Sequence, residues 1–175
     1  MLHGLARAGR TVADIPPQYV DVRNALASAE YDGIHFSGHG KFPDRSNPAK
    51  AEIELEGGKK LRPSDISGVA ANLGRRRPLV FLNACQVGRQ APGLTGIGGW
   101  ASALVHNGAA AFVGTHWEVT DDLALRFASA FYSRLDARQT IAAAARDARL
   151  AIRDGGDPTW LAYTVFADRG ATLAA

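Results

Sequence analysis

The sequence of 175 residues has almost no cysteine and no long apolar run. Its single cysteine, Cys85, excludes an internal disulfide and a zinc site built from several cysteines. No stretch approaches the roughly 18 consecutive apolar residues that a membrane-spanning helix needs. Residues 1–10 also lack the apolar run of a signal peptide. We therefore expect a cytoplasmic protein that does not need a membrane.

An excess of charge of one sign is also missing. Twenty Lys and Arg residues against 17 Asp and Glu residues leave a net charge of +3 over the whole chain. Domains that bind nucleic acid carry a concentrated basic patch, so this balance indicates no nucleic-acid partner. The basic triplet Arg75, Arg76 and Arg77 precedes a predicted strand, and we interpret it as a solvated surface turn.

The chain does contain enough apolar sequence for one buried core. Hydrophobic residues make up 46% of the sequence and charged residues 21%, which is typical of globular domains. A length of 175 residues suits one domain and leaves no room for two full ones. We expect a single domain over residues 1–175.

Apolar runs that predict strands alternate with stretches of helical spacing. The predicted strands of the main sheet cover residues 33–37, 78–83, 109–114 and 160–166. The predicted helices cover residues 18–29, 63–74, 100–107, 121–135 and 139–153. A further short strand is predicted at 11–15, and a hairpin at 52–55 and 59–61. This order predicts an α/β fold, a three-layer sandwich with a mostly parallel sheet and helices on both faces.

Two loops that follow buried strands carry the chemistry. The strand at 33–37 ends in Gly38, His39 and Gly40, and the strand at 78–83 ends just before Cys85. Function collects at the carboxyl ends of parallel strands, so neighbouring strands would bring the histidine and the cysteine together. An imidazole beside a thiol can remove its proton and give a thiolate that attacks a carbonyl carbon. Without this context, a lone cysteine is more often a small buried hydrophobe.

Residues 34–40, 82–88, 108–121 and 160–166 form four motifs. These motifs resemble those of CHAT domains, the caspase-like cysteine peptidases related to caspases and separases. Residues 34–40 resemble the histidine motif and residues 82–88 the cysteine motif. Residues 108–121 resemble the strand and Trp-x-Val-x-Asp stretch that follow the cysteine in CHAT proteins and separases. Residues 160–166 resemble the closing strand. The motifs occur in the family's order and together span residues 31–168.

The resemblance implies a caspase-like cysteine endopeptidase that cleaves a protein or peptide substrate without a cofactor. Cys85 would be the nucleophile and His39 the general base. The backbone amides of Gly40 and Cys85 would form the oxyanion hole, because a residue without a side chain lets the substrate carbonyl approach. A zinc site built from His35, His39 and Cys85 is rejected, because no acidic third-ligand pattern accompanies them. We interpret His35 as a core histidine.

The sequence departs from the family pattern in two places. Asn83 stands where the caspase cysteine motif has glutamine, which argues against a true caspase. The family's first core strand and helix have no clear counterpart, so we expect either a fragment of a larger protein or a sheet completed by a different segment. An activating protein, or the remainder of the same polypeptide, would then control activity. The alternative is a catalytically silent caspase-like interaction module.

The stretch after the third strand offers residues for substrate binding. Trp117 suits either the core or the wall of a substrate groove. Asp121 and Asp122 begin a predicted helix, where carboxylates complement the helix dipole. The functional alternative is that one of them binds an Arg or Lys side chain before the scissile bond, as acidic residues do in separases. We interpret the glycine-rich residues 86–99 as a mobile loop, since they fit no nucleotide-binding motif.

Overall fold

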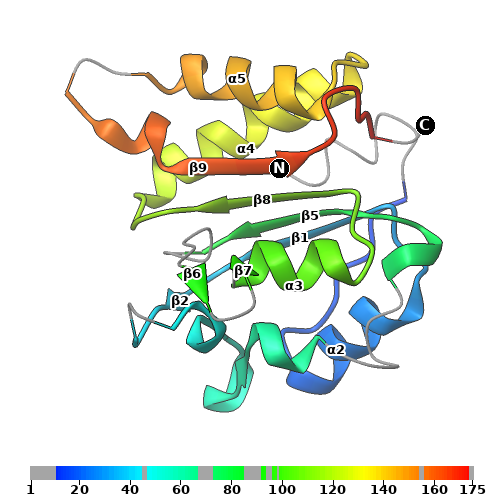
Figure 1. The fold of residues 1–175 in the computed structure, drawn as a ribbon. Helices are drawn as coiled ribbons and strands as arrows, with labels where there is room; N and C mark the ends of the chain where they lie inside the picture. Colours follow the sequence, from blue (N-terminus) through cyan, green and yellow to red (C-terminus); the bar gives the residue numbers. More distant parts are fainter. Residues whose placement is uncertain are drawn as a thin grey trace.

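The computed structural model describes residues 11–44, 47–66, 73–84, 99–153 and 156–173, and the backbone of 92–93 and 96–97. A central sheet lies between two helical layers (Figure 1). Helices α4 (Asp121–Asp136) and α5 (Ile141–Ala151) cover one face of the sheet. Helices α2 (Tyr19–Ser28) and α3 (Trp100–His106) lie on the other. The three-layer α/β sandwich predicted from the sequence is confirmed.

The central sheet has four strands in the order β1-β5-β8-β9. Their bounds are Gly33–Ser37, Leu79–Asn83, Ala111–Thr115 and Tyr163–Ala167. β1, β5 and β8 run parallel, and β9 is antiparallel to β8. The carboxyl ends of three strands and the amino end of β9 therefore meet at one edge of the sheet. All four predicted strands are confirmed to within three residues.

Four α-helices in the described part of the chain agree with predicted ones. They are α2 (Tyr19–Ser28), α3 (Trp100–His106), α4 (Asp121–Asp136) and α5 (Ile141–Ala151). α4 shows why the pattern is predictive, because its residues at helical spacing, Leu123, Phe127, Phe131 and Leu135, are all buried. At the start of α5 the hydroxyl of Thr140 accepts a hydrogen bond from the N–H of Ala143 at 3.2 Å.

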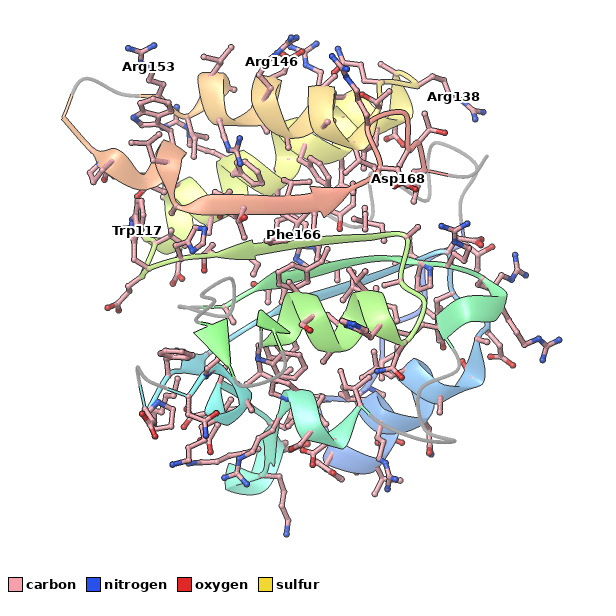
Figure 2. All side chains as sticks on the ribbon, in the orientation of Figure 1. Trp117, Arg138, Arg146, Arg153, Phe166 and Asp168 are labelled. Atoms are coloured by element: carbon pink, nitrogen blue, oxygen red, sulfur yellow. The ribbon has the colours of Figure 1, made fainter. Side chains whose placement is uncertain are left out.

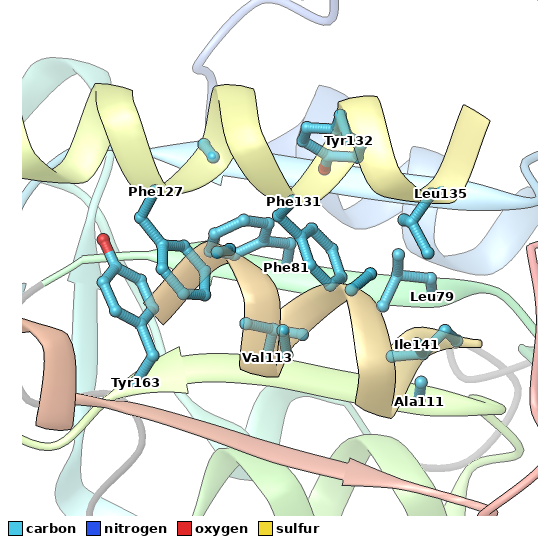
Figure 3. Close-up of a cluster of buried hydrophobic side chains, with 14 of the residues drawn as sticks. Leu79, Phe81, Ala111, Val113, Phe127, Phe131, Tyr132, Leu135, Ile141 and Tyr163 are labelled. Atoms are coloured by element: carbon cyan, nitrogen blue, oxygen red, sulfur yellow. The ribbon is translucent and has the colours of Figure 1, made fainter. Parts of the chain in front are cut away.

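Side chains that alternate along β5 build two cores. Phe81 points toward α4 and contacts the rings of Phe127 and Phe131 edge-on (Figure 3). Val80 and Leu82 pack on the opposite face in the cluster that includes Trp100 of α3. Because both faces of β5 are covered, every residue of this strand is buried.

Two predicted elements differ from the structure. Residues 11–15 form no strand, because they have no ladder partner among the described residues and the next residues, Pro16 and Pro17, lack backbone donors. The helix predicted over 63–74 is replaced by 3-10 turns at its two ends, η3 (Pro63–Asp65) and η5 (Leu73–Arg75), and residues 67–72 lie outside the described ranges. At the start of η3 a capping box forms, in which the Asp65 carboxylate accepts a hydrogen bond from the N–H of Arg62 at 2.8 Å.

A second sheet holds the segment that follows β1. The predicted hairpin is confirmed as β3 (Glu52–Glu54) and β4 (Lys60–Leu61), joined through the turn η2 (Glu56–Gly58). An additional strand, β2 (Gly40–Lys41), pairs antiparallel with β3. The sequence does not predict β2, because two residues show no periodicity.

Shorter elements complete the described chain. They are the 3-10 turns η1 (Pro48–Lys50) and η6 (Pro158–Leu161) and the paired strands β6 (Pro92–Gly93) and β7 (Gly96–Ile97). The two strands belong to the glycine-rich segment at 86–99, and most of that segment, with its predicted mobility, lies outside the described residues. Within the described ranges, no helix is long and apolar enough to cross a membrane.

Candidate active site

The two predicted functional loops leave neighbouring parallel strands at the same edge of the sheet. Ser37, the last residue of β1, lies opposite Asn83, the last residue of β5. The N–H of Gly38 donates to the Asn83 carbonyl at 3.2 Å, which carries the pairing one residue beyond β1. His39 follows Ser37 by two residues, and Cys85 follows Asn83 by the same number. Cys85 itself lies outside the described residues.

His39 is held through its backbone and is exposed. Its carbonyl accepts a hydrogen bond from the N–H of Glu54 in β3 at 2.9 Å. This bond fixes the loop between β1 and β2 against the second sheet. The side chain is therefore attached to an anchored backbone and is open to a substrate.

The glycines on either side of His39 have different roles. A Cβ atom at Gly38 would lie 2.8 Å from Cζ of the Phe36 ring, so only glycine fits there without moving that ring. Gly40 lies opposite Ile53 in the β2–β3 pair. The bond from Glu54 to the His39 carbonyl makes the Gly40–Ile53 pair a non-hydrogen-bonded one. The N–H of Gly40 consequently points out of the β2–β3 ladder.

A buried carboxylate ties the second sheet together. The side chain of Glu52 in β3 is 5% exposed and lies 2.7 Å from Nζ of Lys60 and 2.6 Å from a terminal nitrogen of Arg62. The interactions with Lys60 and then Arg62 keep the pKa of the Glu52 carboxyl below its usual value, although burial opposes them. The strand that anchors His39 is thus cross-linked to β4 by charge.

Two buried hydrogen bonds hold the end of β5. Oγ1 of Thr115, at the end of β8, donates to the carbonyl of Ala84 at 2.6 Å. The hydroxyl of Tyr163, at the start of β9, donates to Oδ1 of Asn83 at 3.2 Å. Thr115 is fully buried, and Asn83 and Tyr163 are nearly so. Asn83 lies two residues before Cys85 in the sequence, whereas no local pattern predicts the roles of Thr115 and Tyr163, although both lie inside motifs that resemble the CHAT family.

Trp117 lies just beyond the same edge of the sheet. It follows β8 by two residues, is half-buried, and stacks against His116 with ring centroids 6.4 Å apart. The N–H of His116 donates to the Ala162 carbonyl at 2.8 Å, which fixes the turn. Figure 2 shows the Trp117 side chain beyond the β8 strand end. The residue therefore packs against its neighbour with one part and is accessible with the other.

Asp121 and Asp122 begin α4, as the sequence predicts, and both are exposed. The Asp122 carboxylate lies 4.0 Å from a guanidinium nitrogen of Arg126 one turn along the helix, and its side chain is 79% exposed. Both carboxylates lie in the first turn, where they complement the helix dipole. Either carboxylate would therefore meet a cationic substrate side chain in contact with solvent, and not inside a buried pocket.

His35 lies inside β1 on the face covered by α4. Its Nδ1 is 2.8 Å from the hydroxyl of Tyr132, and its ring contacts the Phe81 ring edge-on. Burial lowers the pKa of the His35 imidazole to about 4. This environment agrees with the interpretation of His35 as a core histidine. Across the described part of the chain, no group of three or more His, Cys, Asp and Glu side chains is suited to a metal ion.

Comparison with known proteins agrees with this arrangement. The fold is similar to the crystal structure of the Arg-specific cysteine proteinase gingipain R, with a TM-score of 0.66 and 16% sequence identity. The match covers 98% of this chain and 41% of that one, so the chain spans about two-fifths of that proteinase's length. The fold is thus a caspase-like α/β sandwich.

The family follows from the sequence match. The CHAT domain model matches residues 5–166, and the chain therefore belongs to the CHAT domain family. The resemblance of the four motifs to this family is confirmed. No curated protein matches the chain.

Proposed function

We propose that the chain is a caspase-like cysteine endopeptidase in which Cys85 is the nucleophile and His39 the general base. The observation that carries the proposal is the parallel pairing of β1 and β5, with Ser37 opposite Asn83. Each proposed catalytic residue follows one of these paired residues by two positions. Membership of a family with a caspase-like cysteine proteinase fold supports the same chemistry.

In the proposed reaction, the His39 imidazole takes the thiol proton of Cys85. The thiolate attacks the carbonyl carbon of the scissile peptide bond, and the imidazolium returns the proton to the departing amine. Water, deprotonated by His39, then attacks the acyl-enzyme carbonyl and releases the new carboxyl terminus and the thiol. The protein or peptide substrate is consumed without any cofactor.

The amides of Gly40 and Cys85 are the proposed oxyanion-hole donors. The orientation of Gly40 supports this role, because its N–H is outside the β2–β3 ladder and is free of the sheet's own hydrogen bonds. Losing one such donor typically lowers the rate about 10²–10³-fold. The residue at position 40 also has to leave room for the substrate carbonyl, which glycine does.

We propose a preference for Arg or Lys before the scissile bond, with Asp121 or Asp122 as the recognising carboxylate and Trp117 as a wall of the groove. The similar fold of a proteinase described as Arg-specific supports a basic preference. Since both carboxylates are exposed, either one alone is expected to contribute about 1 kcal/mol or less to that preference.

We also propose that an activating protein, or the remainder of the same polypeptide, controls the activity. The backbone N–H and C=O groups of even-numbered residues in and next to β1 point toward β5, as the hydrogen bonds from Leu79 to the Asp32 carbonyl and from Gly38 to the Asn83 carbonyl indicate. The backbone groups of Gly33, His35 and Ser37 therefore face away from β5. Within the described sheet, this outer edge offers unpaired backbone groups to an added segment.

We also propose that residues 1–175 form a single domain and that this peptidase acts in the cytoplasm.

The test is cleavage of a peptide library that varies the residue before the scissile bond. Cys85→Ala and His39→Ala are each expected to abolish cleavage, while Asn83→Ala lowers the rate much less. His106→Ala is the matched control, because His106 is exposed on α3 and bonds within that helix. Normal cleavage by either dyad variant contradicts the assignment. No cleavage by the wild type, together with ordinary thiol reactivity at Cys85, supports the silent interaction module.

A further inference from the structure

The main-chain ladder between β5 and β8 ends before the functional loop begins. Its last register pair is Leu82 with Gly114. Just past the end of β5, a side chain continues the connection: Oγ1 of Thr115 donates to the Ala84 carbonyl at 2.6 Å. Thr115 is fully buried, and Ala84 is nearly so. The bond is therefore shielded from competing water, and it determines where the Ala84 carbonyl oxygen lies.

Covalent geometry carries the effect of this bond to the next residue. The carbonyl of Ala84 and the amide N–H of Cys85 belong to the same peptide group, which is planar and almost always trans. A fixed carbonyl oxygen leaves that amide little freedom to rotate, and a hydrogen bond at the carbonyl also makes the N–H a stronger donor. The Cys85 amide is one of the two oxyanion-hole donors proposed above.

We propose that Thr115 is a positioning residue for the peptidase reaction, one that holds the Ala84–Cys85 peptide group so that the Cys85 amide donates to the oxyanion. This inference rests on the proposed function. Thr115 touches no substrate and removes no proton, so its effect is confined to steps in which a carbonyl oxygen becomes negatively charged. Alkylation of the same thiolate has no such step.

The two kinds of chemistry separate this role from a structural one. In acylation by p-nitrophenyl acetate, the Cys85 sulfur bonds to the ester carbonyl carbon, and the π electrons move to its oxygen. Collapse of this intermediate expels p-nitrophenolate and leaves an acetyl thioester. In alkylation by iodoacetamide, sulfur displaces iodide from a saturated carbon, and no oxyanion forms. Because Cys85 is the only cysteine, both reactions with the thiol are measured at one site.

Thr115→Val preserves the shape of the side chain and removes the donor, whereas Thr115→Ser keeps the donor. We expect Thr115→Val to slow acylation about 10- to 100-fold. This effect is at most that of removing a whole oxyanion-hole donor, because the Cys85 amide is still present. Its alkylation rate should stay within twofold of wild type. Thr115→Ser should recover most of the acylation rate. Thr115→Ala serves as a second donor-free variant if the valine variant does not fold by circular dichroism.

Tyr163→Phe is the matched control for loss of a buried bond at the same strand end. It removes the bond to the Asn83 side chain, which is not part of the Ala84–Cys85 peptide group. It should change acylation and alkylation in the same proportion. An unchanged ratio of the two rates in Thr115→Val and Thr115→Ala overturns the inference. A wild-type thiol whose alkylation does not depend on His39 contradicts the proposed function instead, and the inference with it.

Discussion

His35 should make the stability of the fold depend on pH in a way that can be assigned to one side chain. Burial lowers the pKa of its imidazole from 6.5 to about 4. Nδ1 is bonded to the hydroxyl of Tyr132, and Nε2 is buried without a hydrogen-bond partner in the described structure. A proton on the folded protein would therefore charge a ring that neither water nor a carboxylate stabilises.

The sign follows from proton uptake. Between pH 6.5 and about 4, the unfolded chain binds a proton at His35 that the folded chain does not, so stability falls as the pH falls through this window. At about 1.4 kcal/mol per pKa unit, the loss approaches roughly 3 kcal/mol near pH 4. Above pH 6.5 both states are neutral at this site, and its contribution no longer changes with pH.

The assay is urea denaturation at several pH values between 7.5 and 4, with wild type, His35→Asn and His106→Asn compared. Asparagine at position 35 does not titrate, and its side-chain amide can form a hydrogen bond with the hydroxyl of Tyr132 in place of Nδ1. We expect the free energy of unfolding of wild type to drop relative to His35→Asn by up to roughly 3 kcal/mol across the window. His106→Asn should keep the wild-type slope. Parallel curves for wild type and His35→Asn would show that protonation of His35 does not destabilise the fold.

Three further predictions concern the fold and the specificity. Gly108→Ala should lower the free energy of unfolding, measured by thermal unfolding, by more than about 3 kcal/mol, because the φ of Gly108 is +100° and the added Cβ would lie 2.4 Å from Cα of Gly74. Gly58→Ala is the control and should cost only about 1 kcal/mol, because the space around Gly58 is open. Glu52→Gln should lower the free energy of unfolding by about 1–3 kcal/mol, because a nearly buried carboxylate beside two cations loses its charge. Equal free energies of unfolding for wild type and Glu52→Gln in urea denaturation would contradict this. Asp122→Asn should reduce the preference for Arg over norleucine before the scissile bond by less than tenfold in kcat/KM, and a larger loss would mean that the substrate buries this carboxylate.

The elements that the sequence predicts well are those that local pattern specifies. β5 is a run of apolar residues bounded by Pro78, and α4 repeats apolar residues at helical spacing, so both follow from periodicity. Residues 11–15 have similar strand propensity but form no ladder. A strand needs a partner, and local pattern does not show whether one exists. β2 is missed for the opposite reason, since its pairing with β3 stabilises two residues that carry no pattern of their own.

The candidate site divides in the same way. His39 is predicted from a glycine-flanked histidine at the end of a buried strand, which is a local feature. Thr115 and Tyr163 act on the end of β5 from two other strands, so their contacts depend on the register of β8 and β9. That register results from packing over the whole sheet, and no short stretch of sequence encodes it.

Activation of Cys85 by His39 can be measured through the rate of iodoacetamide alkylation as a function of pH. An ordinary cysteine becomes reactive with a pKa of about 8.5. We predict that the wild-type rate follows a clearly lower apparent pKa, and that His39→Ala moves the profile to about 8.5 while His106→Ala does not. Coincident profiles for wild type and His39→Ala, both with an apparent pKa near that of an ordinary thiol, would mean that His39 does not activate Cys85.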